Sequence, residues 1–208
     1  MVVVVVVGDP SPDWGRRATR AMNPPCGRPR PGRPAKGATA MQFEIVHTLP
    51  ADPDTVLRVM QEKGYYEYLQ QHHPDVDRIE MLSIEDQGNT VRRRVHYQLK
   101  PIIRSVGPKK VPPEAMAWVE ESTLDKASRR LTFRNVPVKD WVQERMTNTG
   151  TIELRDAGGG QTRRIVAGEL KVKFPLLGAI AERVIHGRAR DLLDGEARLF
   201  GEYLKTRG

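Results

Sequence analysis

Histidine is the first residue type to test for chemistry, because its ring can bind a metal or transfer a proton near neutral pH. His72-His73-Pro74-Asp75 groups several metal-ligand types. Adjacent side chains on a helix point about 100° apart, however, so a metal there would need distant ligands that the sequence does not indicate. His47, His96 and His186 are isolated. We therefore predict no metal site, and interpret His47 first as a satisfied buried histidine and second as a general base.

Arg93 is the charged residue with the least expected position. In the segment 90–100, apolar residues alternate with polar ones as in a half-buried strand, and Arg93 shares parity with the apolar set. A guanidinium on the covered face can bind a ligand carboxylate or phosphate. Alternatively, Arg93 lies near the strand end or pairs with a glutamate such as Glu120 or Glu144. Both explanations stay open.

Catalysis would require a general acid or base in the interior, and four residues are candidates for that role: His47, Arg93, Tyr97 and Glu120. The chain has no nucleophile elbow, phosphate loop or metalloprotease helix. Three glycines at 158–160 lie between two expected strands, so we interpret them as a hairpin turn. No cofactor is predicted.

The elements that must position these residues follow one another in a simple order. Residues 43–47 alternate as a strand, and Asp52 with Pro53 begins a helix that is bent or broken at Gly64 and ends at His73-Pro74. Further strands are expected near 77–84, 90–100, 115–124, 129–136, 141–154 and 162–174. An apolar-periodic helix then fills the last thirty or so residues. The fold class is therefore α+β.

The strand parities predict a covered face that is mostly apolar with scattered polar members, the composition expected of a small-molecule pocket. The candidate lining residues are Phe43, Ile45, Arg93, Val95, Tyr97, Trp118, Phe133, Met146, Val166, Leu170, Val184 and Leu192. For Trp118, Phe133 and Met146, core filling is the simpler interpretation. Glycines at 187, 195 and 201 weaken the last helix, which indicates close packing on the sheet rather than a mobile lid.

Residues 1–40 differ in composition from the rest. They hold seven basic against two acidic residues, whereas the remaining chain holds 27 against 24, so the net charge of +8 says little about the folded part. Their Pro/Arg/Gly bias predicts a disordered tail before a domain at 41–208. A competing interpretation makes Met41 or Met22 the true start.

The single cysteine, Cys26, lies in the tail, which excludes disulfides and thiolate sites from the domain and fits a cytoplasmic protein. No apolar run is long enough to span a membrane, and the opening valines lack the basic flank of a signal peptide.

Two basic segments suggest partners. Residues 27–34 resemble an AT-hook, whose arginines enter the DNA minor groove, but Pro31 replaces the usual arginine and the compositional bias produces such strings easily. Nucleic acid is therefore not the expected partner. Residues 102–113 are apolar and basic. They form either a solvated crossover or a portal that touches a membrane surface through Lys109 and Lys110.

From about residue 41 to 204, the element order resembles the helix-grip fold of the START and birch-pollen-allergen superfamily, also called SRPBCC. Residues 43–47 followed by Ala51-Asp52-Pro53 are similar to the start of an uncharacterised bacterial family within it, and residues 168–178 are similar to its end. The resemblance implies a curved antiparallel sheet of about six or seven strands wrapped on the C-terminal helix, and an apolar ligand.

We therefore expect a helix-grip domain that binds a hydrophobic or lipid-like small molecule in an internal cavity. An enzyme of the cyclase or dehydratase type is the first alternative, and a DNA-binding tail is the second.

Overall fold

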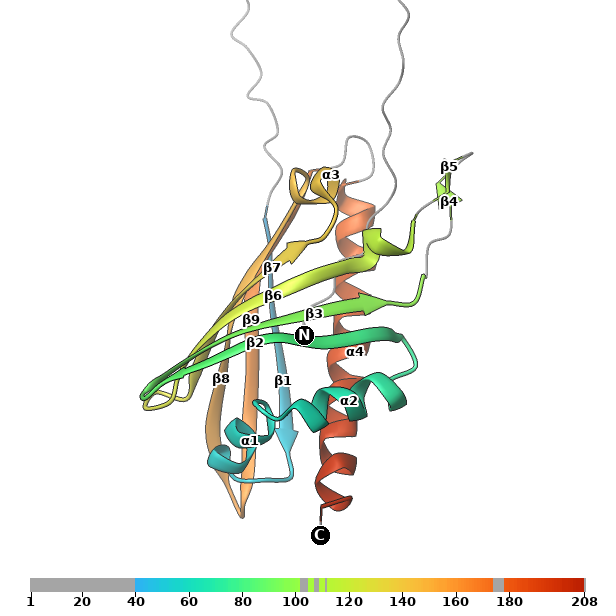
Figure 1. Cartoon of the computed structure of the whole chain (residues 1–208). Helices are drawn as coiled ribbons and strands as arrows, with labels where there is room; N and C mark the ends of the chain where they lie inside the picture. The colour runs from blue at the N-terminus through green and yellow to red at the C-terminus, as the bar shows by residue number, and fades with distance from the viewer. Residues whose placement is uncertain (1–39, 102–104, 107–108, 111, 174–177, 208) are drawn as a thin grey trace, which may run out of the picture.

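The computed structural model describes residues 40–101, 105–106, 109–110, 112–173 and 178–207, with side chains described outside 102–111 and 174–186 (Figure 1). The predicted disordered tail and AT-hook thus lie outside the described residues. So does half of the predicted portal loop, of which the paired segments β4 Ser105–Val106 and β5 Lys109–Lys110 and the two prolines at 112 and 113 are described. These three interpretations stay predictions.

A seven-stranded antiparallel sheet forms the body of the domain, in the order β1-β9-β8-β7-β6-β3-β2. Its strands are β1 Met41–Leu49, β2 Val76–Gln87, β3 Thr90–Leu99, β6 Ala117–Asp125, β7 Arg130–Pro137, β8 Met146–Gly158 and β9 Gln161–Val172. Buried residues alternate with more exposed ones along the strands, except in the edge strand β2, where only Val76 and Ile79 are buried, so the sheet has an inner, covered face and an outer face. The predicted alternation is confirmed, Arg93 included.

The long helix α4, Gly178–Lys205, runs along the inner face from the end of the sheet near α3 to the opposite end, with the sheet curving around it (Figure 1). Its described apolar stripe is buried as predicted: Ala189, Leu192, Leu193, Leu199 and Phe200. The predicted α+β architecture, a curved sheet wrapped on a C-terminal helix, is confirmed. No helix within the described ranges combines the length and apolar character that a membrane span requires.

The predicted first helix is two helices, α1 Pro53–Val59 and α2 Lys63–His72. Asp52 caps α1 as expected, since its carboxylate accepts hydrogen bonds from the backbone N–H groups of Asp54 and Thr55. The break falls at residues 60–62, and Gly64 lies inside α2, which corrects the prediction. The helix ends at His73 as predicted.

The predicted strand at 141–154 is also wrong at its start. Residues 140–143 form one helical turn, α3 Asp140–Gln143, which buries Val142 completely and joins β7 to β8. A 3₁₀ turn, η1 Pro113–Met116, similarly precedes β6. The hairpin turn expected at the three glycines 158–160 is confirmed, and these glycines adopt the left-handed φ values that such a turn requires.

Two of the three helix glycines are in close contact, but with loops rather than with the sheet. A Cβ atom at Gly195 would lie 2.5 Å from Nε2 of His73, and one at Gly201 would lie 3.2 Å from Pro50. At Gly187 the space is open. The predicted close packing is therefore found in the second half of α4, but the glycines there contact His73 and Pro50 and not the sheet.

The two edge strands of the sheet are β1 and β2. β2 pairs with β3 through an irregular register that shifts between Val76 and Arg78 and again between Met81 and Ser83. Helix α2 packs against β2. Leu82 and Ile84 of β2 are exposed.

Candidate ligand site on the inner face

Strand register places the inner-face side chains in rows that cross the sheet. One row, called here the polar row, consists of Asn148 on β8, Asn135 on β7 and Glu120 on β6. All three are at most 3% exposed. Trp118, Tyr97 and Met146 flank the row on one side. On the other side lies a mixed row of Arg93, Ser122, Phe133 and Gly150, followed by the apolar row of Leu124, Leu131 and Ile152. The middle of the inner face is therefore polar, which the sequence predicted only in part.

Arg93 on β3 is fully engaged with protein groups. Its guanidinium forms an ion pair with Glu120 at 2.9 Å and donates to Oγ of Ser122 at 3.1 Å. It also donates to the carbonyl oxygen of Met60 at 2.5 Å and to the hydroxyl of Tyr66. Arg93 thus joins the end of α1, helix α2 and the sheet. Of the two explanations left open, the ion pair with Glu120 is the one the structure shows.

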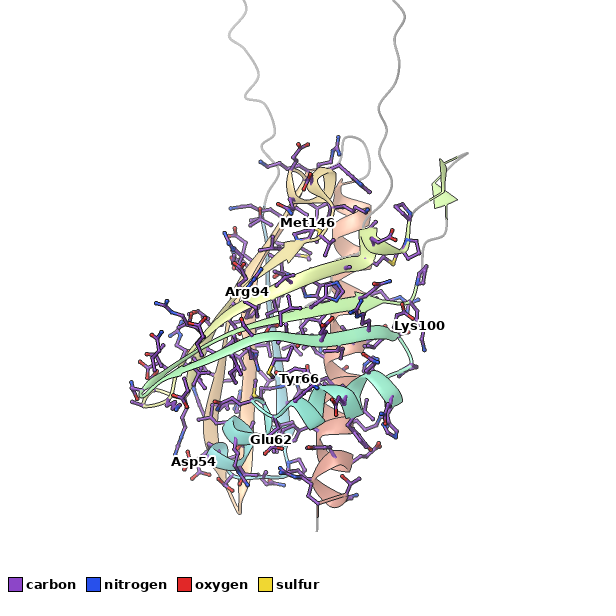
Figure 2. All side chains as sticks on the ribbon, viewed as in Figure 1. Asp54, Glu62, Tyr66, Arg94, Lys100 and Met146 are labelled. Carbon is purple, nitrogen blue, oxygen red and sulfur yellow. The ribbon has the colours of Figure 1, made fainter. Side chains whose placement is uncertain are left out.

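Figure 2 places Tyr66 near the middle of the domain and Met146 at the end of the sheet close to α3. The hydroxyl of Tyr66 donates to the Met60 carbonyl at 2.7 Å while it accepts from Arg93. Burial raises the pKa of Tyr66 although the Arg93 charge opposes this, so the phenol stays protonated at neutral pH. This network fixes the α1–α2 segment on the inner face.

A second buried ion pair joins Arg164 on β9 to Glu196 on α4 at 3.3 Å. Arg164 also donates to Nδ1 of His47 at 3.2 Å, and Nε2 of His47 lies 2.8 Å from Oδ1 of Asp194. A guanidinium can only donate, so Nδ1 must be unprotonated and Nε2 must carry the proton that Asp194 accepts. His47 is therefore a neutral, oriented ring whose two nitrogens are both occupied.

Burial lowers the pKa of His47, and the Arg164 charge lowers it further, which outweighs the opposing effect of Asp194. Burial and then Arg78 lower the pKa of His96 in the same way. A histidine with a depressed folded-state pKa binds its proton at higher pH in the unfolded chain. Its neutral form therefore favours folding at neutral pH, and that advantage is lost as the pH falls below the unfolded value.

We expect the free energy of unfolding to decrease as the pH is lowered below about 6.5, the pKa of an unperturbed histidine, with a slope of at most about 1.4 kcal/mol per pH unit for each ring. Urea unfolding between pH 7.5 and 5 measures the slope. The double variant His47→Gln/His96→Gln should flatten it, since glutamine does not titrate. An unchanged slope in that variant would assign the acid sensitivity to other groups.

Asn148 and Trp118 are buried polar residues whose side chains make no hydrogen bond within the described part of the chain. Asn148 is 1% exposed, and neither its Oδ1 nor its Nδ2 has a partner. Trp118 is fully buried, its ring stacks on Tyr97 at 5.4 Å between centroids, and its Nε1 has no acceptor. Leaving such a group unpaired costs about 1–3 kcal/mol. Both groups are therefore candidates for contact with a bound molecule or water.

The described cavity of the interior is small. Between α1 and the sheet it measures about 10 Å³ and is lined by Met60, Arg93, Ser122, Leu131 and neighbouring apolar side chains. That volume holds about one water molecule, so the lipid-sized hollow expected from the sequence is not present there. An open groove of about 500 Å³ lies instead on the outer face, lined by charged and hydroxyl side chains including Arg92, Arg94 and Arg134.

The predicted lining residues with described side chains are all buried on the inner face or on α4. The structure brings Tyr97 and Trp118 together in one row, and Ile45 and Val166 in another. Phe43 and Phe133 lie on either side of a glycine pair, Gly168 and Gly150. Phe43 is on an edge strand, four strands away from the β6 residues, so it is not part of the polar row. The side chain of Val184 lies outside the description.

Of the four acid–base candidates, three are held by protein groups: His47, Arg93 and Glu120. Tyr97 makes no hydrogen bond within the described part of the chain. Burial, followed by the Glu120 charge, raises its pKa well above the ordinary value. Nowhere in the described ranges do three or more His, Cys, Asp or Glu side chains gather in a way that could hold a metal ion.

Sequence reasoning missed Arg164 and Glu196, although both left a signal. Arg164 shares parity with Val166 and Leu170 on its strand, and Glu196 lies four residues after Leu192 and four before Phe200, within the apolar stripe. A charge in the middle of an apolar face indicates a buried partner. Asn148 lies two residues after Met146 and so shares its face of the strand, but its lack of a partner among the described residues could not be predicted.

The sequence profile of the protein family of unknown function DUF2505 matches residues 44–204. The chain belongs to this family. No curated protein matches it in sequence. The likeness to solved structures is therefore a likeness of fold.

Three of the solved structures with a similar fold are described here. TTHA0849 from Thermus thermophilus shares 17% identity with a TM-score of 0.57, over 81% of this chain and 99% of that one. The ZhuI aromatase/cyclase from Streptomyces sp. R1128 shares 16% with a TM-score of 0.51, over 81% and 96%. Norcoclaurine synthase from Thalictrum flavum shares 16% with a TM-score of 0.55, over 83% and 94%. The predicted helix-grip, birch-pollen-allergen-like fold is confirmed.

Proposed function

We propose that this domain binds a small, largely hydrophobic molecule between the inner face of its sheet and helix α4. The carrying observation is Asn148, a buried amide with no hydrogen-bond partner among the described residues, in a setting of apolar and aromatic side chains. A protein interior rarely keeps such a group unless water or a ligand satisfies it. The unpartnered Nε1 of Trp118, on the same face, supports the same function.

The position of the binding region along α4 follows from simple geometry. Asp194 and Leu193 of α4 lie beside His47 and Arg164. Met41 on β1 pairs with Leu170 on β9, which pairs with Asn148, so Met41 lies at the level of the polar row. It is six residues before His47 on the same strand. Six strand residues span about 20 Å, which equals about thirteen helix residues. The polar row therefore faces the first half of α4, away from the tightly packed end that holds Tyr65 and Phe200.

The known structures support a small-molecule function. One norcoclaurine synthase structure, with a TM-score of 0.56 to this chain, was solved with dopamine and hydroxybenzaldehyde. The fold can thus hold small aromatic molecules. Support for the catalytic alternative is weaker here, because three of its four candidate residues are already bonded to other protein groups.

Ligand binding by the purified full chain tests this function. We expect native mass spectrometry, or displacement of the neutral dye Nile red, to reveal one bound molecule per chain. In a variant whose Trp14 and Trp141 are replaced by phenylalanine, Trp118 is the remaining tryptophan, and we expect its emission to change when a ligand binds. If aromatic, sterol and long-chain alcohol probes all fail to bind or to raise the melting temperature, the function is not ligand binding.

A further inference from the structure

Charge balance on the inner face limits the chemistry of the ligand. The four buried charged side chains of the described residues are Arg93, Glu120, Arg164 and Glu196. They form two ion pairs, Arg93 with Glu120 and Arg164 with Glu196. Each pair is neutral as a unit, so neither arginine is available to meet an additional anion.

A ligand anion at this face would therefore be buried without a counter-charge. Losing its hydration is costly unless a cation or several hydrogen bonds replace the water. To reach Arg93 it would have to displace Glu120 together with the bonds to Ser122, Met60 and Tyr66. The inward position of Arg93 suggested a ligand with a carboxylate or phosphate. Such a ligand would meet no cation that is free of a counter-charge among the described residues of this face.

The side chains of Asn148 and Trp118, which lack partners among the described residues, are neutral. Nε of Arg164 also lacks a hydrogen-bond partner within this part of the chain, but the charge of its guanidinium is already balanced by Glu196. Asn148 offers two N–H donors and a carbonyl acceptor, and Trp118 offers one N–H donor. An uncharged hydroxyl or carbonyl oxygen suits this set, because it can accept from either donor. A hydroxyl can also donate to Oδ1 of Asn148.

We infer that the ligand is a neutral molecule whose hydroxyl or carbonyl group is recognised by Asn148 and Trp118, and that fatty acids and other organic anions are rejected. This inference rests on the proposed small-molecule function and specifies its substrate class. Tyr97, stacked on Trp118, supplies an aromatic surface beside the recognised group.

Matched probes separate charge from hydrophobicity. The aromatic set is naphthalene, 2-naphthol and 2-naphthoate, and the aliphatic pair is 1-decanol and decanoate, each measured by Nile red displacement at pH 7.5. We expect 2-naphthol to bind roughly 3- to 10-fold more tightly than naphthalene, the equivalent of one net hydrogen bond. Each anion should bind at least about tenfold more weakly than its alcohol.

Two variants assign the preference to residues. Asn148→Leu and Trp118→Phe should each reduce the advantage of 2-naphthol over naphthalene while naphthalene still binds. Asn148→Leu should also raise the melting temperature, since it removes an unpartnered amide, so lost recognition cannot be attributed to misfolding. Trp118→Phe keeps an aromatic ring against Tyr97 should the leucine variant fail to fold. Thr147→Val, one residue away on the outer face, is the matched control and should change neither property.

The outcomes distinguish the two proposals. If no probe binds, the small-molecule function fails and the inference fails with it. If the anions bind best, the function stands but the neutral-ligand inference is overturned. Unchanged selectivity in both variants would likewise overturn the assignment to Asn148 and Trp118.

Discussion

Replacing Arg93 with methionine is expected to lower the free energy of unfolding by about 3–5 kcal/mol, because removing one partner of a buried ion pair leaves the other charge without its counter-charge. Here the carboxylate of Glu120 is 1% exposed and would lose the guanidinium 2.9 Å away. The same change breaks the bonds that hold Met60 and Tyr66 to the sheet. Urea unfolding of the purified variant measures the loss.

Two further variants make this test specific. Arg92→Met, on the exposed side of the same strand, should change stability by no more than about 0.5 kcal/mol. The double variant Arg93→Met/Glu120→Leu should recover much of the loss, because an apolar pair can replace a buried ion pair at little cost. Equal effects of Arg93→Met and Arg92→Met would show that the buried network contributes nothing to stability.

Replacing Gly150 with alanine should destabilise the domain by about 3 kcal/mol, the upper part of the range for overpacked sites. A Cβ atom there would lie 2.7 Å from Cζ of Phe133 and would also collide with the backbone carbonyl of Ala167. The phenylalanine ring can move, but a carbonyl inside the sheet cannot move without breaking strand pairing. The shift in the midpoint of chemical denaturation reports the effect.

The matched control is Gly187→Ala on α4. A Cβ atom at Gly187 meets nothing within 4 Å, so only helix propensity changes. Alanine should then raise stability by about 0.5–1 kcal/mol. The same substitution is thus expected to act with opposite sign at two glycines. A gain at both positions would mean that the close approach of β8 and β9 is not tight in solution.

Local pattern was enough to predict the strands, the Asp52 cap and the hairpin turns, because each depends on residues that are close in sequence. The inward parity of Arg93 followed from the same alternation. Its choice of partner could not be predicted, since Glu120 and Glu144 both satisfy the charge rule. Only the register of β3 against β6 places Arg93 beside Ser122 and near Glu120.

The polarity of the interior was underestimated for a related reason. Arg164 follows Arg163, and two adjacent arginines suggest a solvated segment until the register of β9 turns one of them inward. Glu196 becomes understandable only when α4 lies beside β9, about thirty residues earlier in the chain. The volume of the interior depends on how all these side chains interlock, and no periodicity contains that information.

The irregular pairing of β2 has a consequence for solubility. An open sheet ends in a strand with free backbone groups, onto which another molecule can add its own strand. The two register shifts of β2 disturb the regular hydrogen-bond spacing that such an addition requires, and charged side chains of both signs, among them Arg78, Glu80 and Glu85, lie along the same edge. The exposed Leu82 and Ile84 are therefore guarded against the stacking that leads to fibres.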